Sequence, residues 1–443
     1  MPANDFDVIV VGAGAAGLMA AGASSQLGKR TLLLEKNRKL GVKILMSGGT
    51  RCNITHNCDH RGIISAFGKQ GNFLHSALAA FSPLAIIELL HQQGVMTKVE
   101  ETGKIFPVSN RAIDVRDALV RFAKGEGATI FTEQAVRSIL PCTPQDGSAD
   151  SSTTFRVATE DQSWSTQAVI VTSGGRSYPG CGTTGDGYDW ARNFGHSIVP
   201  TVPALVPILC DTKWANELKG ITIPSTNVQV WEPEPSDLEL AQAVDKRKQR
   251  KPKPISKRSG SFLFTHWGFS GPSVLDVSRE VAQHAQKNRL TLRCDFLPDK
   301  RESKLAEFIA RKKQQDGKQI VGNLLNDFFP KRLAEALIVS SGIETTTRNA
   351  ELSTAASQQL VNHLKRCPFS IQGTLGFEKA EVTAGGVDLA EVDSRTMQSK
   401  RIPGLYFAGE VLDLDGYIGG FNFQSAFSTG WLAGQSAAAH HSD

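Results

Sequence analysis

Three glycines near the start of the chain have a spacing that suits a phosphate-binding turn. Gly12, Gly14 and Gly17 follow directly on residues 8–11, an apolar run that predicts a buried parallel strand. The first glycine permits a tight turn, the second lets a diphosphate approach the backbone, and the third lets the next helix pack on the strand. The N-terminus of that helix would offer free N–H groups and positive potential to the anion.

An acidic residue completes this pattern. A second short strand, residues 31–34, ends in Glu35. This acid lies roughly twenty residues beyond the glycines, where a carboxylate accepts hydrogen bonds from a dinucleotide ribose. A lone glycine motif is weak evidence, but strand, turn, helix, second strand and acid together predict a dinucleotide-binding unit.

A second glycine-rich loop follows, SGGTRCN at residues 47–53. It combines flexible backbone with the guanidinium of Arg51 and the amide of Asn53, which are donors suited to phosphate oxygens. We expect it to wrap a phosphorylated cofactor, with a plain surface loop as the alternative.

No acid or base stands out as catalytic. His266 is the one tempting candidate and is interpreted as structural, while Tyr178 either faces a substrate or lies at the edge of the core.

Two later segments return glycines to the same place. Residues 168–175 form an apolar strand that ends in TSGG, and residues 404–410 form another that ends in Gly409 and Glu410. Gly420 then precedes a helix of small residues over about 421–438. The N-terminus of this helix would stabilise negative charge that develops on a cofactor ring.

The elements between these motifs define the domains. Strand and helix patterns alternate over residues 1–200 and resume at 375–443, which predicts an α/β Rossmann-type domain built from both ends of the chain. Prolines near residue 200 mark a boundary. Alternating apolar residues over 201–300 predict a β-barrel-like insertion, and helical periodicity over 301–374 predicts a helical subdomain.

Composition excludes several classes of protein. The 443 residues are 40% hydrophobic and 21% charged, as in a soluble globular protein. The one uncharged stretch of membrane-spanning length, residues 8–28, contains five glycines and the turn described above, so no membrane segment is expected. Seven scattered cysteines without zinc spacing predict reduced thiols, a cytoplasmic location and no metal site.

The net charge of +5 comes from one segment. Residues 246–258 hold eight Lys or Arg and no acid. We interpret this segment as a solvated loop in preference to a nucleic-acid-binding patch.

The chain resembles a bacterial family of NAD(P)/FAD-dependent oxidoreductases, the aminoacetone-oxidase-like and bile-acid-reductase-like flavoproteins of the two-dinucleotide-binding superfamily. The matching motifs span nearly the whole chain in order: VIVVGAGAAG, SGGTRCNIT, TSGGRSYPGCGTTGDGY, LFTHWGFSGP, EVTAGGV and GLYFAGEVLDLDGYIGGFNFQSAFSTG. The resemblance implies FAD as cofactor. It also implies a set of cofactor-binding residues: Gly12, Gly14, Ala15, Ala16, Glu35, Lys36, Arg51, Cys52, Asn53, Val136, Gly174, Gly409, Glu410, Gly420, Phe421 and Asn422.

These observations favour an FAD-dependent oxidoreductase that passes hydride or electrons between a small organic substrate and NAD(P) or oxygen. No second GxGxxG unit marks where a nicotinamide would dock. Two alternatives stay open: an FAD-dependent RNA-modifying enzyme, although a nucleic-acid partner is not the favoured interpretation, and a non-catalytic flavin-binding protein. A disulfide reductase is disfavoured, because five residues separate Cys52 from Cys58 where that class has four.

Overall fold

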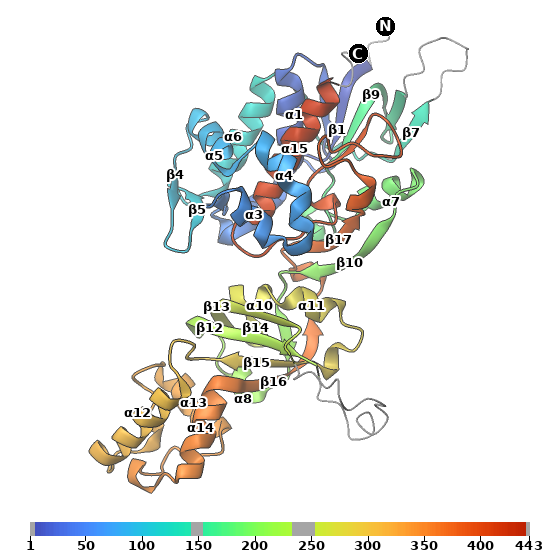
Figure 1. Ribbon diagram of the computed structural model, residues 1–443. Helices are drawn as coiled ribbons and strands as arrows, with labels where there is room; N and C mark the ends of the chain where they lie inside the picture. Colours follow the sequence, from blue (N-terminus) through green and yellow to red (C-terminus); the bar gives the residue numbers. More distant parts are fainter. Residues whose placement is uncertain (1–4, 143–153, 233–252, 440–443) are drawn as a thin grey trace. The chain divides into compact units, whose positions relative to one another are not determined.

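A computed structural model describes residues 5–142, 154–232 and 253–439 of the chain. It contains two compact units, one of residues 1–203 with 380–443 and one of residues 204–379. The first unit therefore takes its chain from both termini. Figure 1 shows the first and last helices of this unit lying side by side.

The core of the first unit is a seven-stranded sheet in the order β6-β2-β1-β9-β8-β7, with β18 also paired to β9. The strands are β1 (Asp5–Val11), β2 (Thr31–Leu34), β6 (Thr129–Phe131), β7 (Ser138–Cys142), β8 (Thr154–Ala158), β9 (Ser163–Val171) and β18 (Leu405–Phe407). The strands β6, β2, β1, β9 and β18 are parallel, whereas β8 pairs antiparallel with both of its neighbours, β9 and β7. This arrangement confirms the expected Rossmann-type sheet.

Small residues let the first and last helices approach closely. α1 (Ala15–Gln26) packs against α15 (Phe421–Ala439), where a Cβ on Gly430 would lie 2.3 Å from the carbonyl oxygen of Ala16. A Cβ on Gly434 would lie 2.4 Å from that of Ala20. On another side of α1, Gly22 receives the ring of Phe122 from α6 (Ala112–Gly125). The two termini are thus joined by backbone contacts that larger residues would prevent.

Smaller elements surround this sheet. A three-stranded antiparallel sheet has the order β3-β5-β4, and β10 pairs with β17. The strands are β3 (Thr55–His56), β4 (Thr97–Val99), β5 (Lys104–Pro107), β10 (Ile198–Ala204) and β17 (Val382–Val387). The helices are α2 (Val42–Met46), α3 (His60–Ala66), α4 (His75–Ala80), α5 (Pro83–Gln92) and α7 (Asp186–Asn193).

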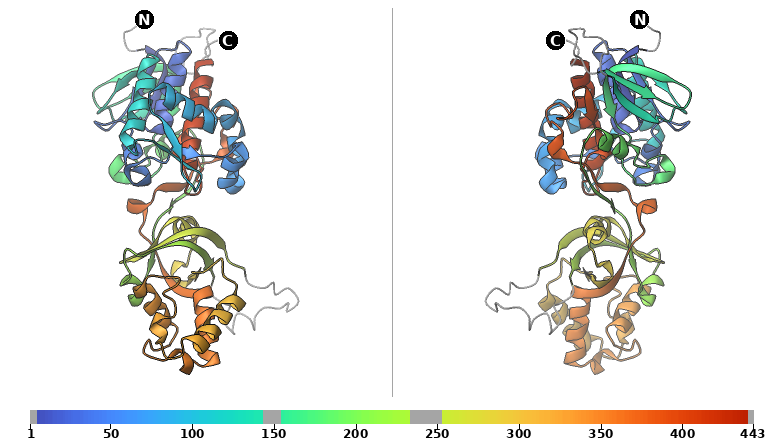
Figure 2. Two further views of the ribbon diagram at one scale, coloured as in Figure 1. Left: turned by 90° about the vertical axis from the view of Figure 1, so that its left-hand side faces the viewer. Right: turned by 90° about the vertical axis from the view of Figure 1, so that its right-hand side faces the viewer.

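The second unit is a closed antiparallel barrel with attached helices, seen in Figure 2. Its strands follow in the order β11 (Ile208–Cys210), β14 (Gly268–Ser270), β13 (Ser256–Thr265), β12 (Thr222–Trp231), β15 (Thr291–Asp295) and β16 (Cys367–Thr374). Buried aromatic rings fill it: Phe262, Phe264, Phe269, Phe296 and Phe369. The helices are α8 (Lys213–Asn216), α10 (Pro272–Leu275), α11 (Ser278–Gln283), α12 (Glu302–Gln315), α13 (Lys331–Ser340) and α14 (Thr354–Arg366).

One boundary inside this unit differs from the sequence prediction. The sequence pattern places residues 367–374 in the helical subdomain, but they form β16, which closes the barrel between β15 and β11. The last barrel strand follows the helices in the chain, so sequence order alone does not reveal its partners. Residues 246–252 of the basic segment lie outside the described residues, and 253–258 lead into β13.

No single helix among the described ranges is long and apolar enough to cross a membrane, although the bent pair of segments Gly68–Ala80 and Pro83–Gln92 reaches that length and hydropathy together.

A partly exposed ion-pair cluster ties residues 388–401 to the segment between α7 and β10 and makes stability depend on pH. The carboxylate of Glu391 accepts hydrogen bonds from the N–H of Ser197 at 2.8 Å and from Arg401 at 2.5 Å, and it lies 3.2 Å from Nδ1 of His196. The Arg401 hydrogen bond, with help from Ser197, lowers the pKa of Glu391 from 4.5 to about 2. A carboxyl group with a depressed pKa stabilises the fold above its unfolded pKa.

We therefore expect the unfolding free energy to fall as the pH drops from about 4.5 towards about 2. Urea titrations across this window should show a shallower pH dependence for Glu391→Gln than for the wild type. Asp393→Asn is the comparison variant. The carboxyl group of Asp393 also has a lowered pKa, but it bonds to Arg395 and not to the partners of Glu391. Identical slopes for wild type and Glu391→Gln would contradict the assignment.

Candidate functional site

The glycine turn lies where the parallel strands β1 and β9 end. Gly12 has φ +105°, and a Cβ there would lie 2.7 Å from the carbonyl oxygen of Thr172, the residue after β9. The hydroxyl of Thr172 donates to the carbonyl oxygens of Val11 at 3.0 Å and Gly12 at 2.8 Å. A Cβ on Gly17 would lie 1.8 Å from the Gly12 oxygen. Both positions therefore require glycine, as the spacing predicts.

The N-terminus of α1 is bare. Its N-cap residue is Gly14, and no side chain makes a capping hydrogen bond there. A Cβ on Gly14 would have nothing within 4 Å, so the space in front of the helix is open. Ala15 and Ala16 form the first turn and are buried. Open space before a positive helix end fits a diphosphate.

Glu35 is buried at the end of β2 and holds the turn from the side. One carboxylate oxygen accepts from the N–H of Ala13 at 2.7 Å, and the other accepts from the backbone and side-chain nitrogens of Asn37 at 2.8 Å. The oxygen bound by Asn37 already accepts two hydrogen bonds, whereas the oxygen bound by Ala13 keeps a second lone pair with which it can accept from a ribose hydroxyl. The N–H of Gln134 donates to the carbonyl oxygen of Glu35, which brings the segment with half-buried Val136 beside it.

Lys36, expected near the ribose, contacts one residue of the loop that precedes α7 and the first residue of that helix. Its ammonium group donates to Asp186 at 2.6 Å and to Thr184 at 2.7 Å. It thereby fixes the glycine-rich loop that follows Gly174, a residue with φ +75°.

The SGGTRCN loop is held in an unusual backbone conformation. Gly48, Gly49, Thr50 and Cys52 all have positive φ. Cys52 is fully buried, so its side chain packs in the core. This burial raises the pKa of the Cys52 thiol to about 12.

The guanidinium group of Arg51 is bound by other side chains of the protein. Its guanidinium forms an ion pair with Glu100, donates to Asn110 at 2.8 Å and lies 4.1 Å from the centre of the Phe106 ring. These partners on and beside β4 and β5 orient the loop.

The loop also meets the start of α15. With its amide oriented to satisfy its neighbours, Asn53 accepts from the N–H of Gly420 at 2.9 Å. A Cβ on Gly420, where φ is +88°, would lie 2.7 Å from the backbone of Thr55. Sequence analysis missed His56, whose Nδ1 lies 3.1 Å from the carbonyl oxygen of Gly419 and whose ring stacks on Phe421 at 4.8 Å.

Asn422, in the first turn of α15, bonds through its amide to both backbone groups of Gly416 at 2.8 Å. It therefore fixes the loop before the helix. The SGGTRCN loop and the glycines before α15 are therefore in direct contact.

A polar cluster connects the remaining predicted residues. Glu410 forms an ion pair with Lys43 and accepts from the hydroxyl of Ser177 at 2.6 Å and from the N–H of Thr383 at 2.9 Å. Lys43 also donates to Ser177 at 2.6 Å. Lys43, Ser177 and Thr383 were not predicted as site residues. They are far apart in sequence, and only the fold brings them together.

Gly409 places this cluster beside the glycine turn. A Cβ on Gly409 would lie 2.8 Å from the Cβ of Ala16, and its N–H donates to Thr429 of α15 at 3.0 Å. His266, the one tempting acid–base candidate, does not join the cluster: it is exposed at the turn between β13 and β14, its ring against Trp267. Tyr178, next to Ser177 in the chain, is half-buried with φ +52°.

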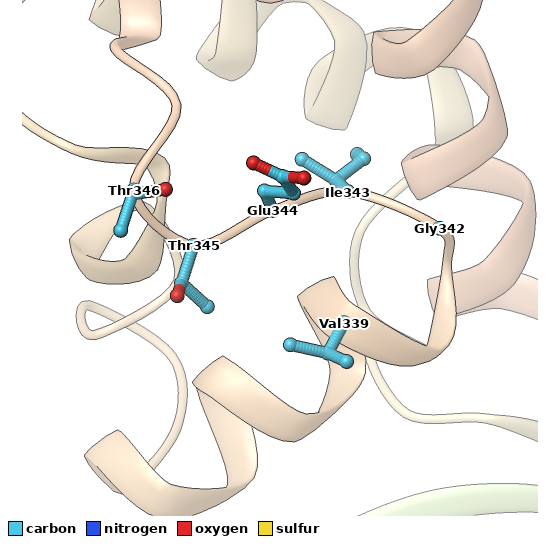
Figure 3. A pocket seen from close by; sticks show the side chains of 6 residues that line it. All are labelled: Val339, Gly342, Ile343, Glu344, Thr345 and Thr346. Carbon is cyan, nitrogen blue, oxygen red and sulfur yellow. The ribbon is translucent and has the colours of Figure 1, made fainter.

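A cavity of about 410 Å³ in the second unit, shown in Figure 3, is lined by Val339, Gly342, Ile343, Glu344, Thr345 and Thr346. It has one ionisable side chain and no nucleophilic thiol or histidine. Within the described ranges, no group of three or more His, Cys, Asp and Glu side chains is placed to hold a metal ion.

A bare helix end behind a glycine turn, a buried acid at the next strand and a second helix N-terminus define a dinucleotide-binding flavoprotein with a Rossmann-type domain. The residues fit FAD: the α1 terminus would hold the diphosphate, Glu35 the adenosine ribose, and the start of α15 the flavin ring. When bound, FAD supplies a ring that exchanges a hydride or electrons.

The chain belongs to the HI0933-like family, whose Rossmann-domain model matches residues 6–436. It is an FAD-dependent oxidoreductase. It is 32% identical to the ribosomal RNA dihydrouridine synthase of Escherichia coli K12, over 97% of each chain. It is 29% identical to the 3-dehydro-bile acid delta(4,6)-reductase of Clostridium scindens, over 97% of this chain and 98% of that protein. A solved 3-ketosteroid-delta4-(5alpha)-dehydrogenase of Rhodococcus jostii aligns with a TM-score of 0.49 and 16% identity, over 98% of this chain and 97% of that one.

Proposed function

We propose that this protein is an FAD-dependent reductase that converts uridine in ribosomal RNA to dihydrouridine. The observation that carries the proposal is 32% identity along 97% of the chain to a ribosomal RNA dihydrouridine synthase. This similarity covers both compact units, so it does not stem from the dinucleotide-binding unit alone. The RNA-modifying alternative is thereby preferred to the small-molecule substrate that the sequence analysis favours.

The reaction class has support from two relatives. Dihydrouridine synthesis saturates the C5–C6 double bond of uracil, which is conjugated with a carbonyl group. The name of the bile-acid reductase describes the same class of change on a dehydro-steroid. Saturating such a bond adds a hydride to one carbon and a proton to the other. We propose a reduced nicotinamide, NADH or NADPH, as the source of the two electrons.

The residues of this chain would act by binding and orientation. The α1 terminus and Gly12 would hold the diphosphate, which fixes the cofactor along the edge of the sheet. The 19-residue helix α15 would place its positive end, at Gly420 and Phe421, toward the flavin ring and stabilise negative charge on it. Lys43 and Glu410 would hold the loop of Ser177 as an ion pair beside Gly409, which lies against Ala16 of α1.

Nucleoside analysis tests the substrate. The chain would be expressed in an Escherichia coli strain lacking its own ribosomal RNA dihydrouridine synthase, and digested ribosomal RNA examined by mass spectrometry. We expect dihydrouridine to return with the wild-type chain and not with Gly14→Asp. A yellow, FAD-loaded protein that restores no dihydrouridine would refute the RNA substrate.

A second candidate function is reduction of a small conjugated ketone, favoured by 29% identity to the bile-acid reductase along nearly the whole chain. Anaerobic mixing of the purified protein with NADH or NADPH, followed by a steroid dienone, distinguishes the two. Re-oxidation of the bleached flavin by the steroid, without dihydrouridine in the RNA assay, would select the small-molecule function.

A further inference from the structure

The charge of the protein is divided unequally between its two units. Residues 204–379 contain 27 Lys or Arg and 19 Asp or Glu, a net charge of +8. The remaining residues, which form the dinucleotide-binding unit, carry a net charge of −3. A polyanion would therefore be attracted more strongly to the barrel unit than to the other unit.

Part of this charge is arranged in a row on the outside of the barrel. Lys257 on β13, Gln229 on β12 and Arg293 on β15 are directly opposite one another across three adjacent strands. Their neighbours Val228, Val230 and Leu292 are buried, and side chains alternate along a strand, so the row faces outward. Lys257 is exposed, and Gln229 and Arg293 are partly exposed.

An aromatic ring lies beside this row. Trp231 is two residues beyond Gln229 on the same face of β12, and its indole N–H donates to the Gln229 side-chain oxygen at 2.9 Å. The guanidinium carbon of Arg293 lies 4.6 Å from the centre of the indole ring. These contacts hold a flat aromatic and cationic surface in place. We call Lys257, Gln229, Arg293 and Trp231 the cationic barrel face.

Two acids lie close to this face. Asp295, two residues beyond Arg293, forms an ion pair with Lys365 at 2.7 Å. Glu232, next to Trp231, is 62% exposed and lies 3.6 Å from His284, which would neutralise it only when protonated. The charge that favours a polyanion here is therefore that of Lys257 and Arg293 together with the net charge of +8 of the unit.

We infer that the cationic barrel face binds single-stranded RNA of the substrate. Cations would contact the phosphates, and Trp231 with Arg293 would stack on an unpaired base, which is how proteins bind single strands on β-barrel surfaces. This inference rests on the proposed function and adds to it the surface that receives the RNA. It concerns the described residues 231, 257 and 293 and does not require the basic residues 246–252.

Fluorescence anisotropy with a fluorescein-labelled single-stranded RNA from ribosomal RNA tests this, using the full FAD-loaded chain. The double variant Lys257→Glu/Arg293→Glu should raise the Kd at least tenfold. It should also make the plot of log Kd against log salt shallower by about 0.7 for each phosphate that the protein no longer neutralises. Trp231→Ala should raise the Kd about tenfold without changing this slope, and Trp231→Phe should retain most of the affinity.

The matched control is Lys304→Glu/Lys331→Glu, which changes the net charge of the same unit equally. These two lysines are 67% and 69% exposed on α12 and α13. The control should bind RNA within about threefold of the wild type, since non-contacting charges act only through screened long-range fields. Thermal unfolding checks that each variant is folded.

The outcomes separate the two proposals. Equal loss of affinity in the control and the face variants would overturn the cationic barrel face, as would unchanged affinity in Lys257→Glu/Arg293→Glu. In either case dihydrouridine formation by the wild type would leave the proposed function standing. A wild-type protein that neither binds RNA nor forms dihydrouridine would refute both.

Discussion

Replacing Gly14 with aspartate is expected to abolish FAD binding without unfolding the protein. Gly14 is the N-cap of α1 with φ −77°, an angle that aspartate adopts readily, and no protein atom lies within 4 Å of the position of a new Cβ. Aspartate is also a better N-cap than glycine, because its carboxylate accepts from the free N–H groups of the first turn. Those are the groups that would bind the diphosphate.

In this variant the carboxylate of the aspartate would lie at the helix end where the negatively charged diphosphate of FAD would bind. Two negative charges about 4 Å apart repel by roughly 4 kcal/mol near a protein surface, which corresponds to about a thousandfold higher Kd for FAD. Absorbance of the purified protein and titration with FAD measure this. Thermal unfolding of the apoprotein should show unchanged or slightly raised stability.

Gly14→Asn is the matched control. It has nearly the same shape and also caps the helix, but it carries no charge. We expect a much smaller rise in the FAD Kd, so the difference between the two variants gives the electrostatic part. If Gly14→Asp purified yellow with the wild-type Kd, the diphosphate would not lie at this helix end.

Substituting Gly430 should lower the stability of the protein, because this glycine joins the two ends of the chain. A Cβ at Gly430 of α15 would lie 2.3 Å from the carbonyl oxygen of Ala16, and the backbone of α1 cannot yield as a flexible side chain would. Overpacking at such a contact destabilises by about 1–3 kcal/mol. We expect Gly430→Ala to lower the unfolding free energy by about this amount, as measured by urea titration.

The same substitution should weaken FAD binding, because Ala16 belongs to the first turn of α1 and would move with the helix. Gln435→Ala, on the same helix at a partly exposed position, is the control and should change neither quantity appreciably. Wild-type stability for Gly430→Ala would show that the two helices are not packed as closely as described.

Much of the fold could be inferred from local patterns. The glycine turn, the acid at residue 35 and the small-residue helix at the C-terminus have spacings that admit few structures, because their backbone requirements are strict. The barrel was also predicted, since its strands alternate apolar and polar residues. The closing strand β16 was assigned wrongly because hydrogen-bonded partners of a barrel strand can lie anywhere in the chain.

The candidate site was only partly predictable from the sequence, because several of its side chains contact residues that are distant in the chain. The loop pattern predicts that the guanidinium of Arg51 is a donor to phosphate. Its partners in the structure, Glu100 and Asn110, come from other elements, which the loop pattern does not indicate. Lys36 turns to Asp186, 150 residues away. No local periodicity records such pairs, because ion pairs form wherever packing brings opposite charges together.

The sequence by itself determined the dinucleotide-binding turn and the requirement that both chain ends share one domain. Those properties depend on backbone conformations that only glycine and small residues allow. Tertiary structure alone decided the cluster of Lys43, Ser177, Thr383 and Glu410 and the cross-strand row of Lys257, Gln229 and Arg293. Side chains from distant elements become neighbours only when strands pair in register and helices pack, so the position of each depends on the whole core around it.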